Sequence, residues 1–185
     1  MNRWILALAA LTLITAGACG DDGGGGGGGG GDDYCAPGGG AYFRITMSGA
    51  VDLAIDEVAG GFGCGGISAQ DGSAFSSSWG GIITQIPGAD FSFILDVVAT
   101  EGTTGSGFEG RITATRSAAD DGSVGPGIWT GSDGDCVVDL TEHTLLEASD
   151  VGGLYLVTGS GSCTQLAVDD LTIESFEFSG VTVWF

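Results

Sequence analysis

Residues 171–185 read LTIESFEFSGVTVWF and carry the clearest structural signal in the chain. Apolar and polar residues alternate along this stretch, as in a strand that buries one of its faces. The alternation changes phase twice, first at Ser175 and again at Ser179 and Gly180. A strand that keeps one face buried must then carry a bulge at each of these points. We therefore expect a curved strand in a closed or wrapped sheet.

Similar short apolar stretches recur along the rest of residues 34–185, separated by turn residues. Asp-Gly pairs at 71–72, 121–122 and 133–134, and Pro-Gly at 87–88, mark the turns. Residues 140–148 have a helix-like composition, and we interpret them as more strand or a loop. About nine to eleven short strands predict an all-β domain, an antiparallel β-sandwich or jelly-roll-like fold. The other expected strands are residues 43–47, 50–55, 74–79, 81–86, 91–98, 108–116, 127–131, 136–140 and 153–162.

The composition excludes some classes of protein. The 185 residues contain 24 Asp and Glu against 4 Lys and Arg, for a net charge of −20. Binding to nucleic acid needs clustered cations that replace the counterions on phosphate, so no nucleic-acid partner is expected. Because 43% of the residues are hydrophobic and only 15% are charged, the chain can build a core. The 38 glycines disfavour helices and support the all-β prediction.

The N-terminal residues have the pattern of a signal peptide. Arg3 precedes an apolar run at 4–16, which is too short to cross the roughly 30 Å of a bilayer's hydrocarbon core as a helix. A positive start, a short apolar run and small residues are typical of a cleaved secretory signal. We predict a signal peptide over residues 1–18.

The residues at the end of this segment, AGAC at 16–19, form a small-residue box that ends in a cysteine. This box resembles that of bacterial lipoproteins, although Leu is commoner than Ala16 at its first position. The resemblance implies that Cys19 is lipidated and becomes the mature N-terminus, which would place the protein in the cell envelope. Gly20 follows the cysteine in place of the Asp that favours inner-membrane retention, so an outer-membrane location is expected. An ordinary secretory signal with Cys19 as a passenger is the alternative.

Residues 19–33 then form a predicted tether. Nine consecutive glycines at 23–31 lie between acidic pairs and cannot bury apolar surface. The 14 residues after Cys19 have a root-mean-square reach of about 20 Å as a random coil. The chain therefore divides into a signal peptide at 1–18, a lipidated tether at 19–33 and a folded domain at 34–185.

Four cysteines fall in the folded domain: Cys35, Cys64, Cys136 and Cys163. In an exported protein an even number of cysteines favours disulfides, and four allow three connectivities. The separations favour Cys35 with Cys64 and Cys136 with Cys163, each loop being worth about 3.6 kcal/mol in the chain-entropy model. A bridge between the two halves is the alternative. Zinc is disfavoured because zinc sites use cysteine pairs separated by two to four residues.

Catalytic patterns are scarce. No G-x-S-x-G elbow occurs, and the single histidine, His143, is expected to be exposed or on a strand face. Carboxylate pairs are so numerous in this acidic chain that chance accounts for them. The loop carboxylates Asp133 and Asp135 could supply oxygens to calcium but do not match the twelve-residue helical-hand loop. Solvated turns are the plainer interpretation. The other carboxylate pairs are 56–57, 120–121 and 169–170.

Aromatic residues are the remaining candidates for a binding face. Trp79, Trp129, Tyr155 and Trp184 lie in or beside expected strands, where rings more often fill the core than bind a sugar or a protein. Trp184 is the best candidate for exposure.

The sequence thus predicts a lipid-anchored envelope protein whose domain is a binding or structural module, with no catalysis, cofactor or metal inferred. Its membrane contact is made through the N-terminal lipid, and an unidentified envelope protein or glycan would be a further partner. Two alternatives stay open: an envelope hydrolase that uses a carboxylate pair, and a calcium-dependent adhesion module.

Overall fold

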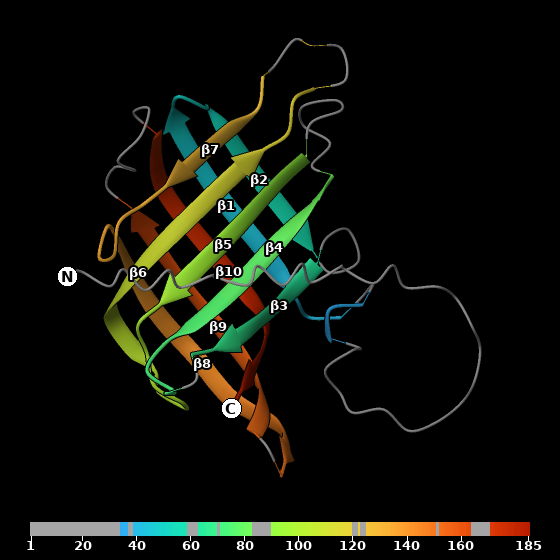
Figure 1. The fold of residues 1–185 in the computed structure, drawn as a ribbon, viewed down its shortest axis with the longest axis vertical. Helices are drawn as coiled ribbons and strands as arrows, with labels where there is room; N and C mark the ends of the chain where they lie inside the picture. The colour runs from blue at the N-terminus through green and yellow to red at the C-terminus, as the bar shows by residue number, and fades with distance from the viewer. Residues whose placement is uncertain are drawn as a thin grey trace, which may run out of the picture.

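A computed structural model describes residues 34–36, 39–58, 63–69, 71–82, 90–119, 122, 125–150, 152–163 and 171–185. Ten β-strands make up most of this part of the chain (Figure 1), which confirms the all-β prediction and the expected number of strands. They are β1 (Tyr42–Gly49), β2 (Leu53–Val58), β3 (Gly63–Ser68), β4 (Phe75–Ile82), β5 (Asp90–Val97), β6 (Gly105–Arg116), β7 (Gly127–Thr130), β8 (Cys136–Ser149), β9 (Gly152–Cys163) and β10 (Leu171–Trp184).

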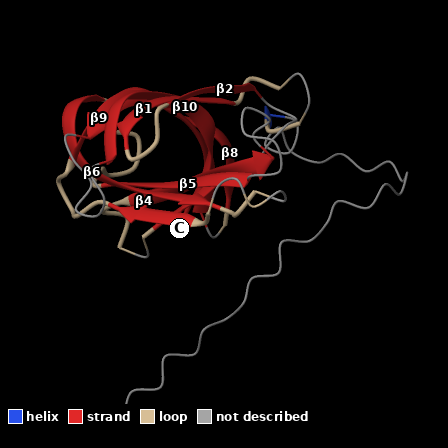
Figure 2. Ribbon diagram, turned by 90° about the horizontal axis from the view of Figure 1, so that it is seen from above, coloured by secondary structure: helices blue, strands red, loops and turns tan. Residues whose placement is uncertain are grey.

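The sheet closes on itself. Its strand order is β2-β1-β10-β3-β4-β5-β6-β8-β9, and β9 also pairs with β10, while β7 extends the edge of β6. Viewed from above, β1, β2, β9 and β10 lie on one side of a flattened ring and β4 and β5 on the other (Figure 2). Two layers therefore face each other, as in a β-sandwich. The neighbours are antiparallel except β10 and β3, which run parallel over Thr182 and Val183.

Strand β10 has the first of its two predicted bulges. Its partner on β1 moves from Ser175 to Ile173 between two consecutive residues, Thr46 and Met47, which leaves an extra residue on β10. The pairing with β9 also shifts between Ile173 and Phe176. The bulge rotates the strand so that Ile173 and Phe176 are both fully buried.

The prediction of a second bulge, at 179–180, is wrong. The pairing with β9 continues without a shift from Phe176 to Trp184. Thr182 rather than Val181 faces the interior, and its Oγ1 lies 3.4 Å from Ser77 Oγ on β4. Gly66 of β3 pairs with both residues and lies between them, so a small polar pair meets over this glycine where the hydrophobic pattern predicted an apolar residue.

Alternating apolar residues fill the interior. Strand β5 shows this most clearly, because its buried and exposed residues alternate along the whole strand. Phe43 on β1 stacks on Trp79 of β4 with ring centroids 4.9 Å apart, and Phe93 on β5 lies 5.0 Å from Phe43. These contacts join the two layers across the ring.

Two stretches differ from expectation in extent. Residues 63–68, GCGGIS, were not expected to form a strand but are β3, held between β4 and β10. Residues 140–148 continue β8, so they are strand rather than loop.

The Asp-Gly turns at 71–72 and 133–134 are present, with Gly72 and Gly134 at positive φ. The Pro-Gly pair at 87–88 lies outside the described residues.

Adjacent glycines on β3 provide a test of how closely the layers pack. A Cβ on Gly66 would lie 2.6 Å from Ser77 Oγ and closer still to the Ser76 carbonyl oxygen, whereas a Cβ on Gly65 meets nothing within 4 Å. We expect Gly66→Ala to lower the free energy of unfolding by about 1–3 kcal/mol, as overpacking does. Gly65→Ala should change it by less than about 0.5 kcal/mol. Urea denaturation checks both, and equal midpoints for the two variants would contradict this packing.

Candidate functional site

The four cysteines of the domain form two disulfides, Cys35–Cys64 and Cys136–Cys163, which is the pairing that sequence separation favours. Cys136 and Cys163 are directly paired residues of β8 and β9, with Cα atoms 4.0 Å apart. Cys35 precedes β1 and is joined to β3, with Cα atoms 5.7 Å apart. Both β1 and β3 pair with the same edge of β10, so this bond bridges the place where one partner of β10 ends and the next begins. Cys19 lies outside the described residues.

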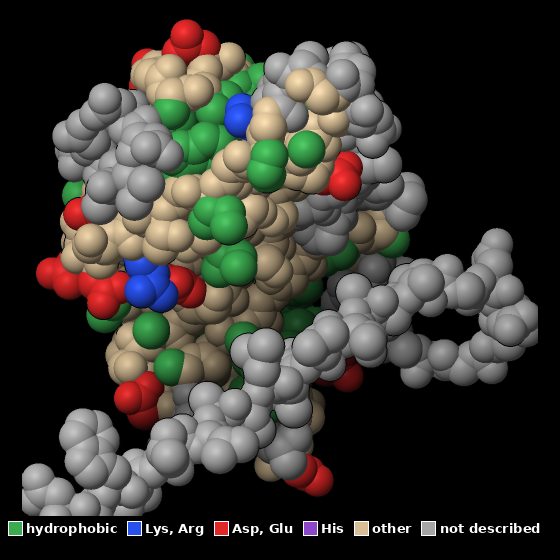
Figure 3. Space-filling view, turned by 45° about the horizontal axis from the view of Figure 1, so that its top comes forward, with side chains coloured by type: hydrophobic (Ala, Val, Ile, Leu, Met, Phe, Trp, Pro, Cys, Tyr) green, Lys and Arg blue, Asp and Glu red, His purple; other side chains and the backbone are tan. Residues whose placement is uncertain are grey.

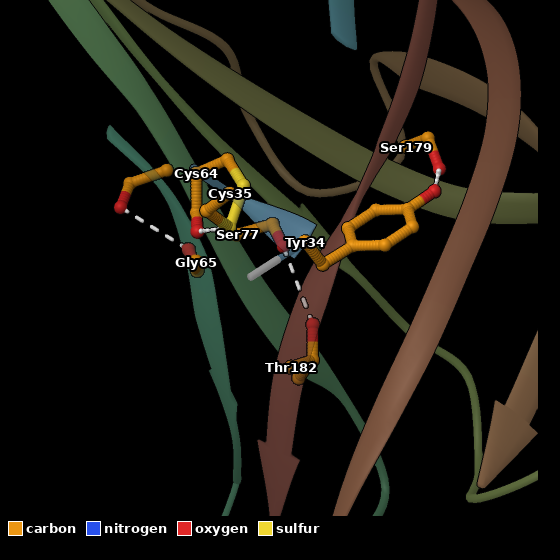
Figure 4. Close-up of a disulfide and its surroundings, with 8 residues drawn as sticks. Tyr34, Cys35, Cys64, Gly65, Ser77, Ser179 and Thr182 are labelled. Carbon is orange, nitrogen blue, oxygen red and sulfur yellow. Dashed lines mark hydrogen bonds between the residues drawn. A yellow bond between two sulfur atoms is a disulfide. The ribbon is translucent and has the colours of Figure 1, made fainter. Parts of the chain in front are cut away.

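The N-terminal end of the described chain is held at the outer face of β10. The Tyr34 hydroxyl lies 2.7 Å from Ser179 Oγ (Figure 4). Ser179 Oγ in turn lies 2.9 Å from Thr158 Oγ1 on β9. Cys35, the next residue, is covalently bound to Cys64. The point where the predicted tether reaches the domain is therefore fixed by one covalent bond and a chain of hydroxyl groups. We call Tyr34, Cys35, Cys64 and Ser179 the tether junction.

Removal of the buried disulfide should cost stability because it releases a closed loop in the unfolded chain. The sequence separation of Cys136 and Cys163 is 27 residues, and both side chains are 1% exposed. We expect the double variant Cys136→Ala with Cys163→Ala to lose about 3–4 kcal/mol of unfolding free energy. Denaturant unfolding of the oxidised proteins measures this loss. An unchanged midpoint would mean that the bond contributes nothing to the fold.

The four candidate binding-face aromatics are buried. Trp79 and Trp184 are 2% exposed, Trp129 is 5% and Tyr155 is 7%. The expectation that Trp184 is exposed is wrong, because unshifted pairing along the end of β10 turns it inward. Its neighbours Val183 and Phe185 are exposed instead.

His143 lies on a strand face as expected, but it is buried at 6% exposure rather than exposed. Its ring is surrounded by aromatic rings, with centroid distances of 4.7 Å to Trp184, 5.3 Å to Tyr155 and 6.2 Å to Phe75. Nδ1 lies 3.2 Å from the carbonyl oxygen of Thr103. Nε2 has no hydrogen-bond partner among the described residues. We call His143 and the three rings the histidine cluster.

The loop between β5 and β6 contacts this cluster. It supplies the Thr103 carbonyl to His143 and the Glu101 carboxylate to the Tyr155 hydroxyl, which donates a hydrogen bond to it. Burial lowers the pKa of His143, while the Thr103 hydrogen bond and the Glu101 charge act in the opposite direction. The hydrogen bond to Glu101 raises the pKa of Tyr155. At neutral pH the cluster therefore holds a neutral imidazole in an aromatic setting.

The lowered pKa of His143 makes folding stability depend on pH. Below about pH 6.5 the unfolded chain binds a proton that the folded chain does not, so stability falls as the pH decreases. His143 is the single histidine of the chain, so no other imidazole titrates in this range. We expect wild type to lose unfolding free energy between about pH 7.5 and pH 5.5, and His143→Gln to lose much less over that range. Urea titrations at both pH values measure this difference, and the same slope in the variant would contradict it.

The carboxylates singled out in the sequence have structural roles where they are described. Asp135 accepts a hydrogen bond from the Ser132 backbone at 2.6 Å, and Asp133 pairs with Arg111 at 3.1 Å. These contacts support the interpretation of the 133–135 segment as a turn. Asp56 pairs with Arg44 at 2.8 Å. The pairs at 120–121 and 169–170 lie outside the described residues, and the side chain of Glu57 is not described.

Each of two outer-face arginines is bonded to two carboxylates. Arg44 lies 2.8 Å from Asp56 and 3.3 Å from Glu177, and these hydrogen bonds raise its pKa. Arg111 on β6 lies 2.6 Å from Asp96 and 3.1 Å from Asp133. Figure 3 shows a cationic side chain flanked by acidic ones on the face that it draws. The positive charges are thus compensated locally, and the surface around them has a net negative charge.

Two surface grooves lie beside these arginines. The larger, of about 460 Å³, lies over β3–β6 and is lined by Ile67, Ser76, Asp96 and Arg111, among others. The smaller, of about 310 Å³, lies over β1, β2 and the β10 bulge beside Arg44. The larger groove shares Phe75 with the histidine cluster, and the smaller groove shares none of its residues. Their size suits a side chain or a small ligand, and the charged groups in each lining are paired with one another, around Arg111 in the larger groove and around Arg44 in the smaller.

Comparisons with known proteins leave the chain unassigned: it matches no protein-family model, no curated protein and no solved structure. Within the described ranges, no group of three or more His, Cys, Asp or Glu side chains is placed to hold a metal ion. No helix in the same ranges has the length and apolar character needed to cross a membrane.

Proposed function

We propose that this protein is a lipid-anchored protein of the bacterial cell envelope, and that its β-sandwich domain acts there as a binding or structural module. The observation that carries the proposal is the box at 16–19, which follows a signal-like segment and ends in Cys19. Glycine-rich residues 20–33 come directly after it and suit a tether. Two disulfides support an exported location, because they persist in oxidising compartments.

The tether junction also supports anchoring. A domain held by a lipid at its N-terminus would transmit any pull through the first folded residues. Here Cys35 is covalently bound to Cys64 on β3, and Tyr34 contacts Ser179 on β10. The pull would therefore act on β3 and β10, which pair with each other, as well as on β1. We propose the outer membrane as the location and assign the domain no catalytic step.

The anchor is tested by metabolic labelling of the whole protein in bacteria. Wild type should incorporate radiolabelled palmitate, and Cys19→Ala should not, because the thiol is the proposed acyl acceptor. The variant with Cys136→Ala and Cys163→Ala serves as the control and should keep its label. Equal labelling of wild type and Cys19→Ala would refute the anchor. Membrane fractionation of the labelled protein then tests the outer-membrane location.

A further inference from the structure

Part of the outer surface of the sheet lacks charged side chains although the chain carries 24 acidic residues. Strands β3 and β9 contain no charged residue, and β10 contains none after Glu177. These three strands are neighbours, since β10 pairs with β9 on one edge and with β3 on the other. The charge-free strands therefore form a continuous surface. The neighbouring strand β8 carries a charged residue, Glu147, which pairs with Leu154 of β9.

Apolar side chains lie side by side on this surface. Val183 on β10 pairs with Ile67 on β3 and with Leu154 on β9, so the three residues form a row across three strands. Ile67 is 53% exposed, Val183 is 38% and Phe185, beyond the end of β10, is 57%. Leu154 is half-buried. We call Ile67, Leu154, Val183 and Phe185 the apolar row, and adjoining exposed apolar residues of this kind mark a surface that is covered in use.

The apolar row lies on the same outer face as the tether junction. Ser179, which contacts Tyr34, and Val183 both point outward on β10, and the four residue steps from one to the other span about 13 Å of strand. This distance is shorter than the roughly 20 Å reach of a 14-residue tether. An anchored lipid would therefore hold the face with the row close to the membrane at a high effective concentration.

The charge distribution of the protein favours one possible binding partner of the apolar row over another. A second copy of this chain would bring another net charge of −20 against the first, which opposes association. A lipid surface without net charge imposes no such repulsion, and β3, β9 and the end of β10 carry no charged side chain that would have to be desolvated there. Tyr34, whose hydroxyl contacts Ser179, also lies at this face, and tyrosine is a residue that membrane–water interfaces favour.

We propose that the apolar row lies against the lipid headgroup region when the protein is anchored, so that the domain rests on the membrane in one orientation. The proposal depends on the lipid anchor proposed above. The groove over β3–β6 shares Ile67 with the row, so it would lie at the rim of the contact with the membrane. Apolar side chains placed at the headgroup and acyl boundary add to the binding that an acyl chain provides.

The test uses the full lipidated protein in vesicles of phosphatidylcholine and phosphatidylethanolamine in equal parts, with hydroxyl-radical oxidation read by mass spectrometry. Val183→Asp places a charge in the row and should lift it from the lipid. We expect Ile67 and Phe185 to be oxidised about threefold or more slowly in wild type than in this variant, because the interface shields them. Ile67→Asp is the second variant on a different strand and should expose Phe185 in the same way.

Matched controls are available on strands away from the row. Val137 on β8 and Ile128 on β7 are 56% and 68% exposed. Val137→Asp should leave the oxidation of Ile67 and Phe185 as in wild type, and Ile128 should be oxidised equally in every protein. Circular dichroism of each variant checks that the fold is retained.

Three results would overturn the proposal, and they separate it from the anchor. If both proteins float with the vesicles but the row is oxidised equally in wild type and Val183→Asp, the anchor would be supported and the lipid contact refuted. If protection of the row from oxidation increases as more protein is bound to the same amount of lipid, the row would instead contact a second copy of the protein. If wild type does not float with the vesicles, both the anchor and the lipid contact would be refuted.

Discussion

The structure depends on the pairing of β10 along both of its edges. One edge pairs with β9 over nearly the whole strand, and the other pairs first with β1 and then with β3. Without the short parallel pairing to β3, the two layers would be joined at only one side. A closed sheet leaves fewer unpaired edges than two separate sheets, which matters for a chain this rich in β-structure. The bulge at Ser175 provides the bend that this strand needs.

Closure also explains the distribution of small residues. Where the sheet passes from β10 through β3 to β4, Gly66 lies between Thr182 and Ser77, and a larger side chain at this position would not fit. Farther along the ring, Phe43, Trp79 and Phe93 fill a wider space. The high glycine content of the domain is thus a consequence of packing as well as of turns. At the other end, the histidine cluster closes the interior beneath the loop between β5 and β6.

Charge is distributed unevenly over the outside. The outer-face arginines at 44 and 111 are each neutralised by a pair of acidic side chains, and acidic turns dominate elsewhere. Strands β3 and β9 and the end of β10 lack charge altogether. The outer surface is therefore uneven, and the tether junction lies where the charge-free end of β10 meets the Arg44 and Glu177 ion pair.

Periodicity along single strands predicted much of the fold, because one-sided burial imposes a period of two whatever the neighbouring strand is. It was sufficient for β5, for the Ser175 bulge and for the Asp-Gly turns. It was insufficient for β3, since GCGGIS has little strand propensity and is held in place by β4 and β10. The inward position of Thr182, the burial of Trp184 and His143, and the row formed by Ile67, Leu154 and Val183 all depend on residues far apart in the chain. The sequence alone therefore determined the all-β class and the turns at 71–72 and 133–134, because these are local properties, while the anchor and the tether stay predictions. Only the tertiary structure decided which residues share a face, because pairing between distant strands sets the register that turns each side chain inward or outward.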